Sequence, residues 1–170
     1  SEVFMSDKFT EAQREISANR KEIIEKLVRF ALTDALLFWS HNDELSRRQE
    51  KLWMPVIIWA RKLLHTEIVT TDGLDVPKEN EKIVDELKVF LEKLSDKKLT
   101  ALYLAALDMR SVILAMALVQ GRLDAEEAYK AAWLEELWQA EKGGIDPEAE
   151  SKRLEQKKEL QEIEAFLKRD

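Results

Sequence analysis

The chain has 170 residues, of which 45% are hydrophobic and 36% charged, and its net charge is −7. A chain of this length suits one compact domain, and four glycines and three prolines are too few for a β-sandwich or barrel. Basic residues interleaved with a larger number of acids argue against a nucleic-acid-binding protein. The absence of cysteine excludes a disulfide framework and cysteine-ligated zinc.

Apolar residues in the first forty positions follow helical spacing, from Phe9 to Phe38, with a break expected near residues 17–20. A polar turn at residues 40–43 leads into a second helical region, where Pro55 either kinks the helix or begins a new one. Residues 66–78 lose the helical period and contain Gly73 and Pro77, so they predict the longest loop.

The middle of the chain predicts the core. A helical stripe resumes over residues 79–94, and Ser95 or Asp96 can cap the next helix. The most apolar region, residues 99–119, contains Asp108 and Arg110, each of which would cost about 3 kcal/mol at the centre of a bilayer. We therefore interpret this region as a central buried helix pair and expect no membrane insertion.

The last third of the chain has clear helix boundaries. Gly121 suits a helix end, and Asp124 with Glu127 predicts a capping box for one helix that continues to about residue 142. Two glycines end that helix, and Asp146 followed by Pro147 begins a last helix to about residue 169. The sequence thus predicts an all-α fold: a compact multi-helix bundle forming a single domain over residues 1–170.

Sequence motifs for catalysis are missing. The two histidines, His41 and His65, do not share a helix face as zinc ligands would. No glycine-rich phosphate loop and no nucleophile elbow occurs. We therefore predict a protein that is not an enzyme and has no catalytic residues, no cofactor and no metal site.

The helix predicted from residue 124 contains a candidate binding surface. Trp133, Leu134, Leu137 and Trp138 alternate there with polar residues, and not all of these can face the core. Glu136 and Gln139 are three residues apart and share a face, so beside an exposed aromatic rim they would form a polar contact point for a protein partner. The spacing fits equally well a solvated acid and a glutamine without a binding role.

Five motifs then occur in a recognisable order. They are Thr33-Asp34-Ala35-Leu36-Leu37, Arg48-Gln49 with Trp53-x-Pro55-x-x-x-Trp59-Ala60, Ser111-Val-Ile-Leu-Ala-Met-Ala117, Leu134-Glu-Glu-Leu-Trp-Gln139, and Gly144-x-Asp146. Over about residues 20–168 the chain resembles the helical domain of the ATP synthase assembly chaperones, which bind the α subunit of the catalytic head before it meets the β subunit.

The resemblance implies a soluble, all-helical domain that shields the β-binding surface of the α subunit and hydrolyses no nucleotide. The family's Leu-Asp-Glu-x-Phe-Gln segment corresponds to residues 134–139, which implies that Glu135, Glu136, Trp138 and Gln139 contact the partner. It also implies a location in the bacterial cytoplasm or the mitochondrial matrix. No targeting segment is recognised in the chain.

The chain also departs from the family. Members usually carry a small β-rich domain ahead of the helices, and we expect this chain to lack it. Where the family tends to have Tyr-Arg, Trp-Asp-Pro, Gly-Ser and Trp-Gly, this sequence has Phe38-Trp39, Trp53-Met54-Pro55, Arg110-Ser111 and Gly143-Gly144.

These departures leave a second hypothesis open: an engineered helical scaffold, either a designed binder or an epitope-displaying immunogen, that has lost the original function. Its partner would be a designed target or an antibody. An exposed patch of Phe38, Trp39 and Met54 would then carry the interaction, since aromatic residues supply much of the energy of protein interfaces. The simpler interpretation is that the three side chains pack inward.

Overall fold

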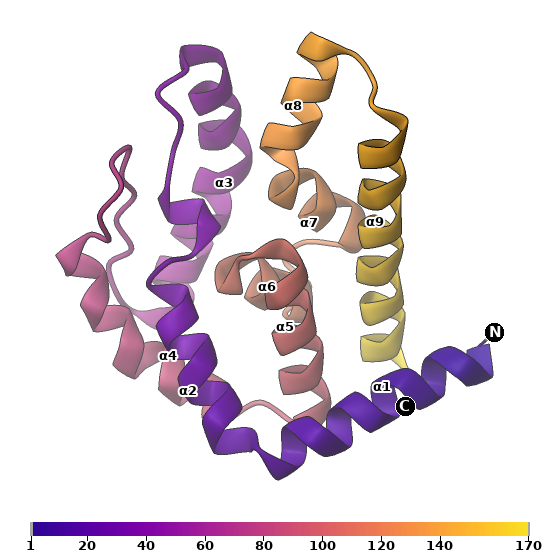
Figure 1. Ribbon diagram of the computed structural model, residues 1–170. Helices are drawn as coiled ribbons and strands as arrows, with labels where there is room; N and C mark the ends of the chain where they lie inside the picture. Colours follow the sequence, from indigo (N-terminus) through magenta and orange to yellow (C-terminus); the bar gives the residue numbers. More distant parts are fainter. Residues whose placement is uncertain (1, 170) are drawn as a thin grey trace.

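The computed structural model describes the backbone of residues 2–169 and the side chains of residues 8–169 (Figure 1). Its helices are α1 (Glu2–Ala18), α2 (Arg20–Ala31), α3 (Asp43–Leu64), α4 (Ile83–Glu92), α5 (Asp96–Met109), α6 (Val112–Val119), α7 (Ala125–Ala132), α8 (Leu134–Gly143) and α9 (Pro147–Lys168), with short 3₁₀ helices η1 (Ala35–Leu37) and η2 (Lys78–Lys82). Across these residues the β-structure consists of one isolated bridge, between Phe38 and Thr71. The predicted all-α fold is confirmed.

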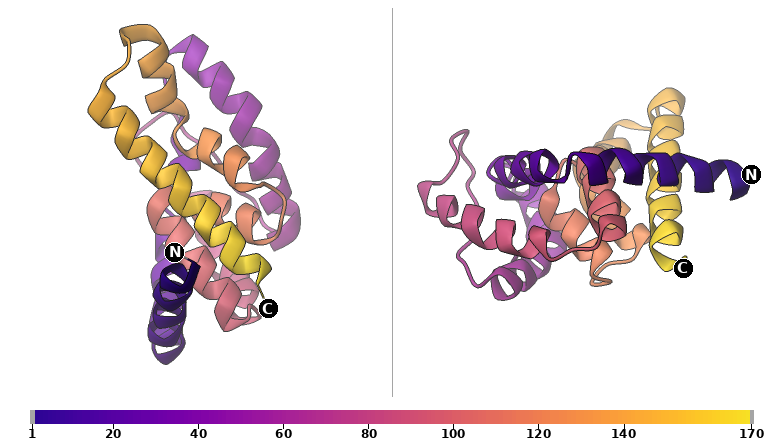
Figure 2. Two further views of the ribbon diagram at one scale, coloured as in Figure 1. Left: turned by 90° about the vertical axis from the view of Figure 1, so that its right-hand side faces the viewer. Right: turned by 90° about the horizontal axis from the view of Figure 1, so that it is seen from below.

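Helix α6 forms the centre of the molecule, and the other helices surround it. All eight of its residues, Val112–Val119, are buried. A helix that is apolar on every side needs neighbours on every side, and α6 packs against α2, α3, α5, α7 and α9. Figures 1 and 2 show α1 crossing one end of this assembly, with α8 at the opposite end. The predicted central helix pair is α5 with α6.

The predicted break near residues 17–20 is confirmed at Asn19, between α1 and α2. The next residue, Arg20, binds the end of another helix. Its guanidinium donates to the carbonyl oxygens of Leu91, Glu92 and Leu94, at 3.2, 3.1 and 2.6 Å, and to Asp96 Oδ1 at 2.8 Å. A cation thus satisfies carbonyls that the end of α4 leaves free.

The expectation that the first forty residues are helical is wrong beyond Ala31, where α2 ends and Asp34 accepts hydrogen bonds from two backbone N–H groups. Its Oδ1 accepts from the Leu36 N–H at 3.0 Å, and its Oδ2 accepts from the Ile113 N–H at 2.9 Å. The second bond joins residues 79 positions apart. Together with Ser111, whose hydroxyl accepts from the Leu114 N–H, Asp34 therefore satisfies the free N–H groups at the start of α6.

The loop predicted at residues 66–78 is present and is held by a buried amide. Asn80 Oδ1 accepts from the Val69 N–H at 2.7 Å, and its Nδ2 donates to the Val69 carbonyl at 2.8 Å. Of the two alternatives for Pro55, the start of a new helix is wrong, because α3 continues from Asp43 to Leu64. Pro55 is exposed, so the carbonyl it leaves without a helical donor faces the solvent side.

The capping box of Asp124 and Glu127 is confirmed, but the single helix predicted to residue 142 is divided at Trp133 into α7 and α8. The indole N–H of Trp53 donates to the carbonyl of Ala131 at 2.8 Å. In an unbroken helix, the carbonyl of Ala131 would accept a hydrogen bond from the N–H four residues later. A side chain inserted into the helical hydrogen bonds therefore accounts for the break.

Burial raises the pKa of the Asp34 carboxyl to about 6, although the N–H groups of Ile113 and Leu36 oppose this rise. Because the folded pKa lies above the unfolded value of about 3.9, the folded protein binds the proton more tightly, and this group stabilises the fold most below pH 4. We expect its contribution to the free energy of unfolding to fall by up to about 3 kcal/mol as the pH rises through 6. A carbon-detected NMR titration should show a midpoint near 6, and a midpoint at or below 4 would contradict this prediction.

The substitution Trp53→Phe should leave the buried Ala131 carbonyl without its donor. We expect the free energy of unfolding to fall by about 1–3 kcal/mol, the usual cost of an unsatisfied buried polar group. Chemical denaturation measures this change. Trp59→Phe, at a half-buried position of the same helix, serves as the control, and an equal loss in both variants would argue against the role assigned to the indole N–H.

Candidate protein-binding site

Helix α8 presents different residues to the core and to solvent. Leu134 is buried, whereas Glu135 and Gln139 are exposed and 38% of the Glu136 side chain is accessible. Trp138 is half-buried and packs against the core. Glu136 and Gln139 therefore face solvent, but the tryptophan between them in sequence is turned mostly inward.

The Glu136 carboxylate pairs with an arginine from a distant turn. Its Oε1 lies 3.3 Å from a terminal guanidinium nitrogen of Arg110, which follows α5 in a left-handed conformation with φ of 56°. The carbonyl of Arg110 accepts from the Ala35 N–H at 3.1 Å. The sequence motifs at residues 33–37 and 134–139 thus meet beside Arg110, which directly precedes the motif at residues 111–117. Their separation along the chain did not reveal this.

Arg110 has a left-handed backbone conformation, which is unusual for a residue other than glycine. A side chain with a Cβ atom is strained there, and glycine is not. In this chain the arginine keeps the turn and adds a cation beside Glu136. Both side chains of the pair are accessible, 69% for Arg110, so solvent weakens their attraction.

On its other side α8 is joined to α3 by four alternating charges. Arg48 lies 2.8 Å from Glu141 and 3.5 Å from Glu44, and Lys142 lies 2.9 Å from Glu44. Lys142 lowers the pKa of Glu44, and Arg48 lowers the pKa of Glu141. The indole N–H of Trp138 also lowers the pKa of Glu44, although no hydrogen bond of good geometry joins the two groups. These charges join α8 to α3, but their side chains are partly accessible, so solvent weakens this attraction as well.

A hollow of about 640 Å³ lies between α3, α8 and α9. Leu134, Leu137 and Ala140 of α8 line it together with Leu52 of α3, and Ile145 stands at its edge with 69% of its surface exposed. Charged residues of both signs surround this apolar lining: Arg48, Lys130, Glu141, Glu150 and Arg153. Sequence reasoning missed this hollow, because its lining comes from four separate segments.

The aromatic residues of the second hypothesis do not form an exposed patch. Phe38, Trp39 and Met54 are half-buried and pack against the core. The Trp39 indole N–H donates to the carbonyl of Leu36 at 2.9 Å, and its ring meets Trp53 edge-on at 6.4 Å between centroids. The simpler interpretation, that these residues pack inward, describes the structure.

The described residues contain no group of histidine, aspartate and glutamate side chains that could hold a metal ion. His41 is exposed, with its Nδ1 3.9 Å from Asp72 Oδ2, and His65 is an exposed residue at the end of α3. A half-buried acid, Asp108 of α5, has its pKa raised to about 7 by desolvation and by the neighbouring Glu159 of α9. Among the helices of residues 2–169, none is long and apolar enough to span a bilayer.

Comparison with known proteins gives a consistent result. The family model of the ATP12 chaperone protein matches residues 5–61. The crystal structure of Atp12 from Paracoccus denitrificans matches this chain with a TM-score of 0.85 at 27% sequence identity, over 92% of this chain and 67% of that one. A point mutant of the same protein gives the same values.

A candidate chaperone from Agrobacterium tumefaciens matches with a TM-score of 0.77 at 31% identity, over 92% of this chain and 60% of that one. The chain therefore spans about two thirds of these matched proteins. The resemblance to the ATP12 assembly chaperone family, predicted from the order of the motifs, is confirmed. Nothing in these matches supports an engineered scaffold.

The strain at position 110 can be measured with two substitutions. Both substitutions remove the ion pair with Glu136. Arg110→Ala keeps a Cβ atom in the left-handed turn, whereas Arg110→Gly removes it. We expect the glycine variant to be more stable than the alanine variant by about 1 kcal/mol, the cost of the left-handed region for a residue with a side chain. Urea denaturation compares them, and equal stability would show that the turn carries no strain.

Proposed function

We propose that this chain is a non-enzymatic assembly chaperone that binds the α subunit of the ATP synthase catalytic head before it meets the β subunit. The observation that carries the proposal is the likeness to Atp12 from Paracoccus denitrificans, which extends over 92% of this chain. The assembly chaperone role follows from the family resemblance. The identity of the bound subunit is the further step that the resemblance implies.

We place the contact with the α subunit on the solvent side of α8, at Glu135, Glu136 and Gln139. Glu136 and Trp138 are two residues apart, so they point in directions about 160° apart around the helix. Trp138 packs inward and fixes the helix, which leaves Glu136 available to a partner. Trp138 therefore acts by positioning α8 more than by contact.

The pair of Glu136 with Arg110 supports this placement. An accessible ion pair contributes little to stability, so the carboxylate can exchange its cation at small cost. A basic side chain of the α subunit would then replace Arg110, and Gln139 would supply an amide beside it. The bacterial cytoplasm or the mitochondrial matrix, where the ATP synthase head is assembled, is the location that this role requires.

The proposal is tested by titrating the chain with an isolated α subunit. We expect Glu136→Lys to raise the Kd at least tenfold, which corresponds to about 1.4 kcal/mol, because the added lysine would face both Arg110 and a basic partner group. Glu86→Lys is the matched control, since Glu86 is an exposed acid of α4 that forms no ion pair with any other described residue. Its Kd should stay within about twofold of the unchanged chain.

The possible results separate the role from the site. A folded chain that does not bind the α subunit would contradict the proposed partner. Binding that Glu136→Lys and Gln139→Ala both leave unchanged would keep the partner but exclude this face of α8. An equal loss in the Glu86→Lys control would assign the effect to overall charge and would also exclude the face.

A further inference from the structure

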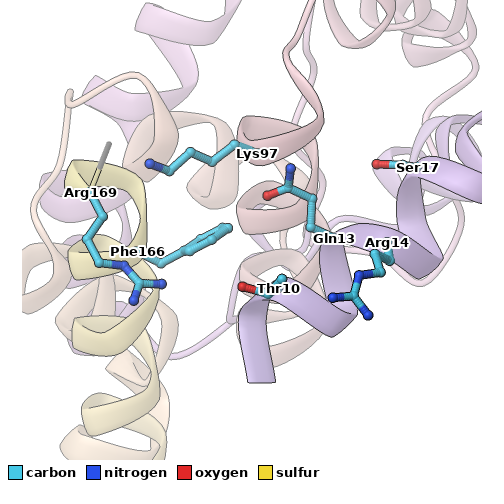
Figure 3. A pocket seen from close by; sticks show the side chains of 7 residues that line it. All are labelled: Thr10, Gln13, Arg14, Ser17, Lys97, Phe166 and Arg169. Atoms are coloured by element: carbon cyan, nitrogen blue, oxygen red, sulfur yellow. The ribbon is translucent and has the colours of Figure 1, made fainter. Parts of the chain in front are cut away.

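A second hollow, also of about 640 Å³, lies at the end of the molecule opposite α8, where α1 crosses α5 and α9. Figure 3 shows its lining, with residues of α1 on one side, Lys97 of α5 beside them, and residues of the end of α9 on the other side. The lining residues are Thr10, Gln13, Arg14, Ser17, Lys97, Phe166 and Arg169.

The charges in this hollow are all positive. Arg14, Lys97 and Arg169 line it, and no carboxylate does so among the described residues. Two acids near the hollow have other partners: Asp96, next to Lys97 in sequence, pairs with Arg20 at 2.8 Å, and Glu159 of α9 pairs with Lys8 at 3.4 Å. Among residues 8–169, no carboxylate forms an ion pair with Arg14, Lys97 or Arg169, in a chain whose net charge is −7.

Two of the cations lie over the same aromatic ring. Lys97 Nζ is 5.5 Å and Arg169 Cζ is 5.4 Å from the centroid of the Phe166 ring, which stacks on Phe9 at 5.1 Å and is only 5% exposed. Attraction to the ring stabilises each cation only weakly. This attraction does not remove the repulsion between the two positive charges. A bound anion would attract both cations and offset that repulsion.

The remaining groups also favour an anion. Lys97 lies in the first turn of α5, where the helix dipole is positive, although Ser95 caps the Lys98 N–H and Asp96 adds an acid to the same turn. A guanidinium presents paired donors that match the oxygens of a phosphate, and Gln13 and Ser17 can donate further hydrogen bonds. The volume falls in the range of small-molecule sites.

We infer that the hollow between α1, α5 and α9 binds a small phosphate-bearing anion with two or more negative charges. Lys97 and Arg169 hold its oxygens, Arg14 adds a positive charge from the α1 side of the hollow, and the buried Phe166 ring keeps Lys97 and Arg169 in place. The inference does not depend on the proposed chaperone role, because α1, whose residues line the hollow, lies at the opposite end of the molecule from α8 (Figure 1).

The inference is tested by isothermal titration of the chain with inorganic pyrophosphate at constant ionic strength. We expect the double variant Lys97→Ala with Arg169→Ala to bind at least tenfold more weakly than the unchanged chain. The matched control is Lys62→Ala with Lys158→Ala, which removes two exposed cations outside the hollow. It should bind within about twofold of the unchanged chain, and circular dichroism checks that each variant is folded.

Three results would overturn the inference. The first is no binding by the unchanged chain at millimolar pyrophosphate, and the second is an equal loss in the double variant and its control. The third is tighter binding of a hexaglutamate peptide than of pyrophosphate, lost in the double variant, which would assign the hollow to an acidic polypeptide. Pyrophosphate binding that only the substitutions in the hollow weaken would support it, and Arg14→Ala should then also lower the affinity.

Discussion

The Asp34 carboxylate lies at the start of α6, and the arrangement of the other helices depends on it. Helix α6 is apolar on every side, so no charged residue of its own can satisfy the N–H groups at its start. A segment 79 residues earlier supplies the acceptor, and Ser111 supplies a second one locally. This contact ends the first helical region after Ala31 and fixes the polypeptide against the centre of the molecule.

The same contact places the proposed binding face. Because residues 34–37 lie against the start of α6, the Ala35 N–H reaches the carbonyl of Arg110 in the turn just before that helix. This turn directs the Arg110 side chain toward Glu136 of α8. A buried hydrogen bond and an accessible ion pair are thus parts of one connected region. The buried hydrogen bond between Asp34 and the Ile113 N–H stabilises the fold, and the accessible ion pair of Arg110 and Glu136 remains open to exchange with a partner.

The structure explains which predictions succeeded. The capping box of Asp124 and Glu127 and the start of α9 at Asp146 were predicted, and of the two predicted caps for α5, Ser95 forms the cap. Each depends on hydrogen bonds within three residues. The single helix over residues 124–142 failed, because Trp53, 78 residues earlier in the chain, takes the carbonyl of Ala131. No local pattern could show this contact. In the candidate site, the solvent-facing side of Glu136 and Gln139 was predicted from spacing, but Arg110 was not recognised as its neighbour.

By itself, the sequence determined the all-α fold, the central pair of buried helices and most helix ends, because apolar periodicity and capping act over a few residues. The order of its motifs also determined the family resemblance. The tertiary structure alone decided where Asp34, Trp53 and Arg110 find their partners, since each of these contacts joins residues from 26 to 79 positions apart. It likewise decided where cations gather without acids, because the hollow beside α1 brings together side chains from three helices that have no common sequence pattern.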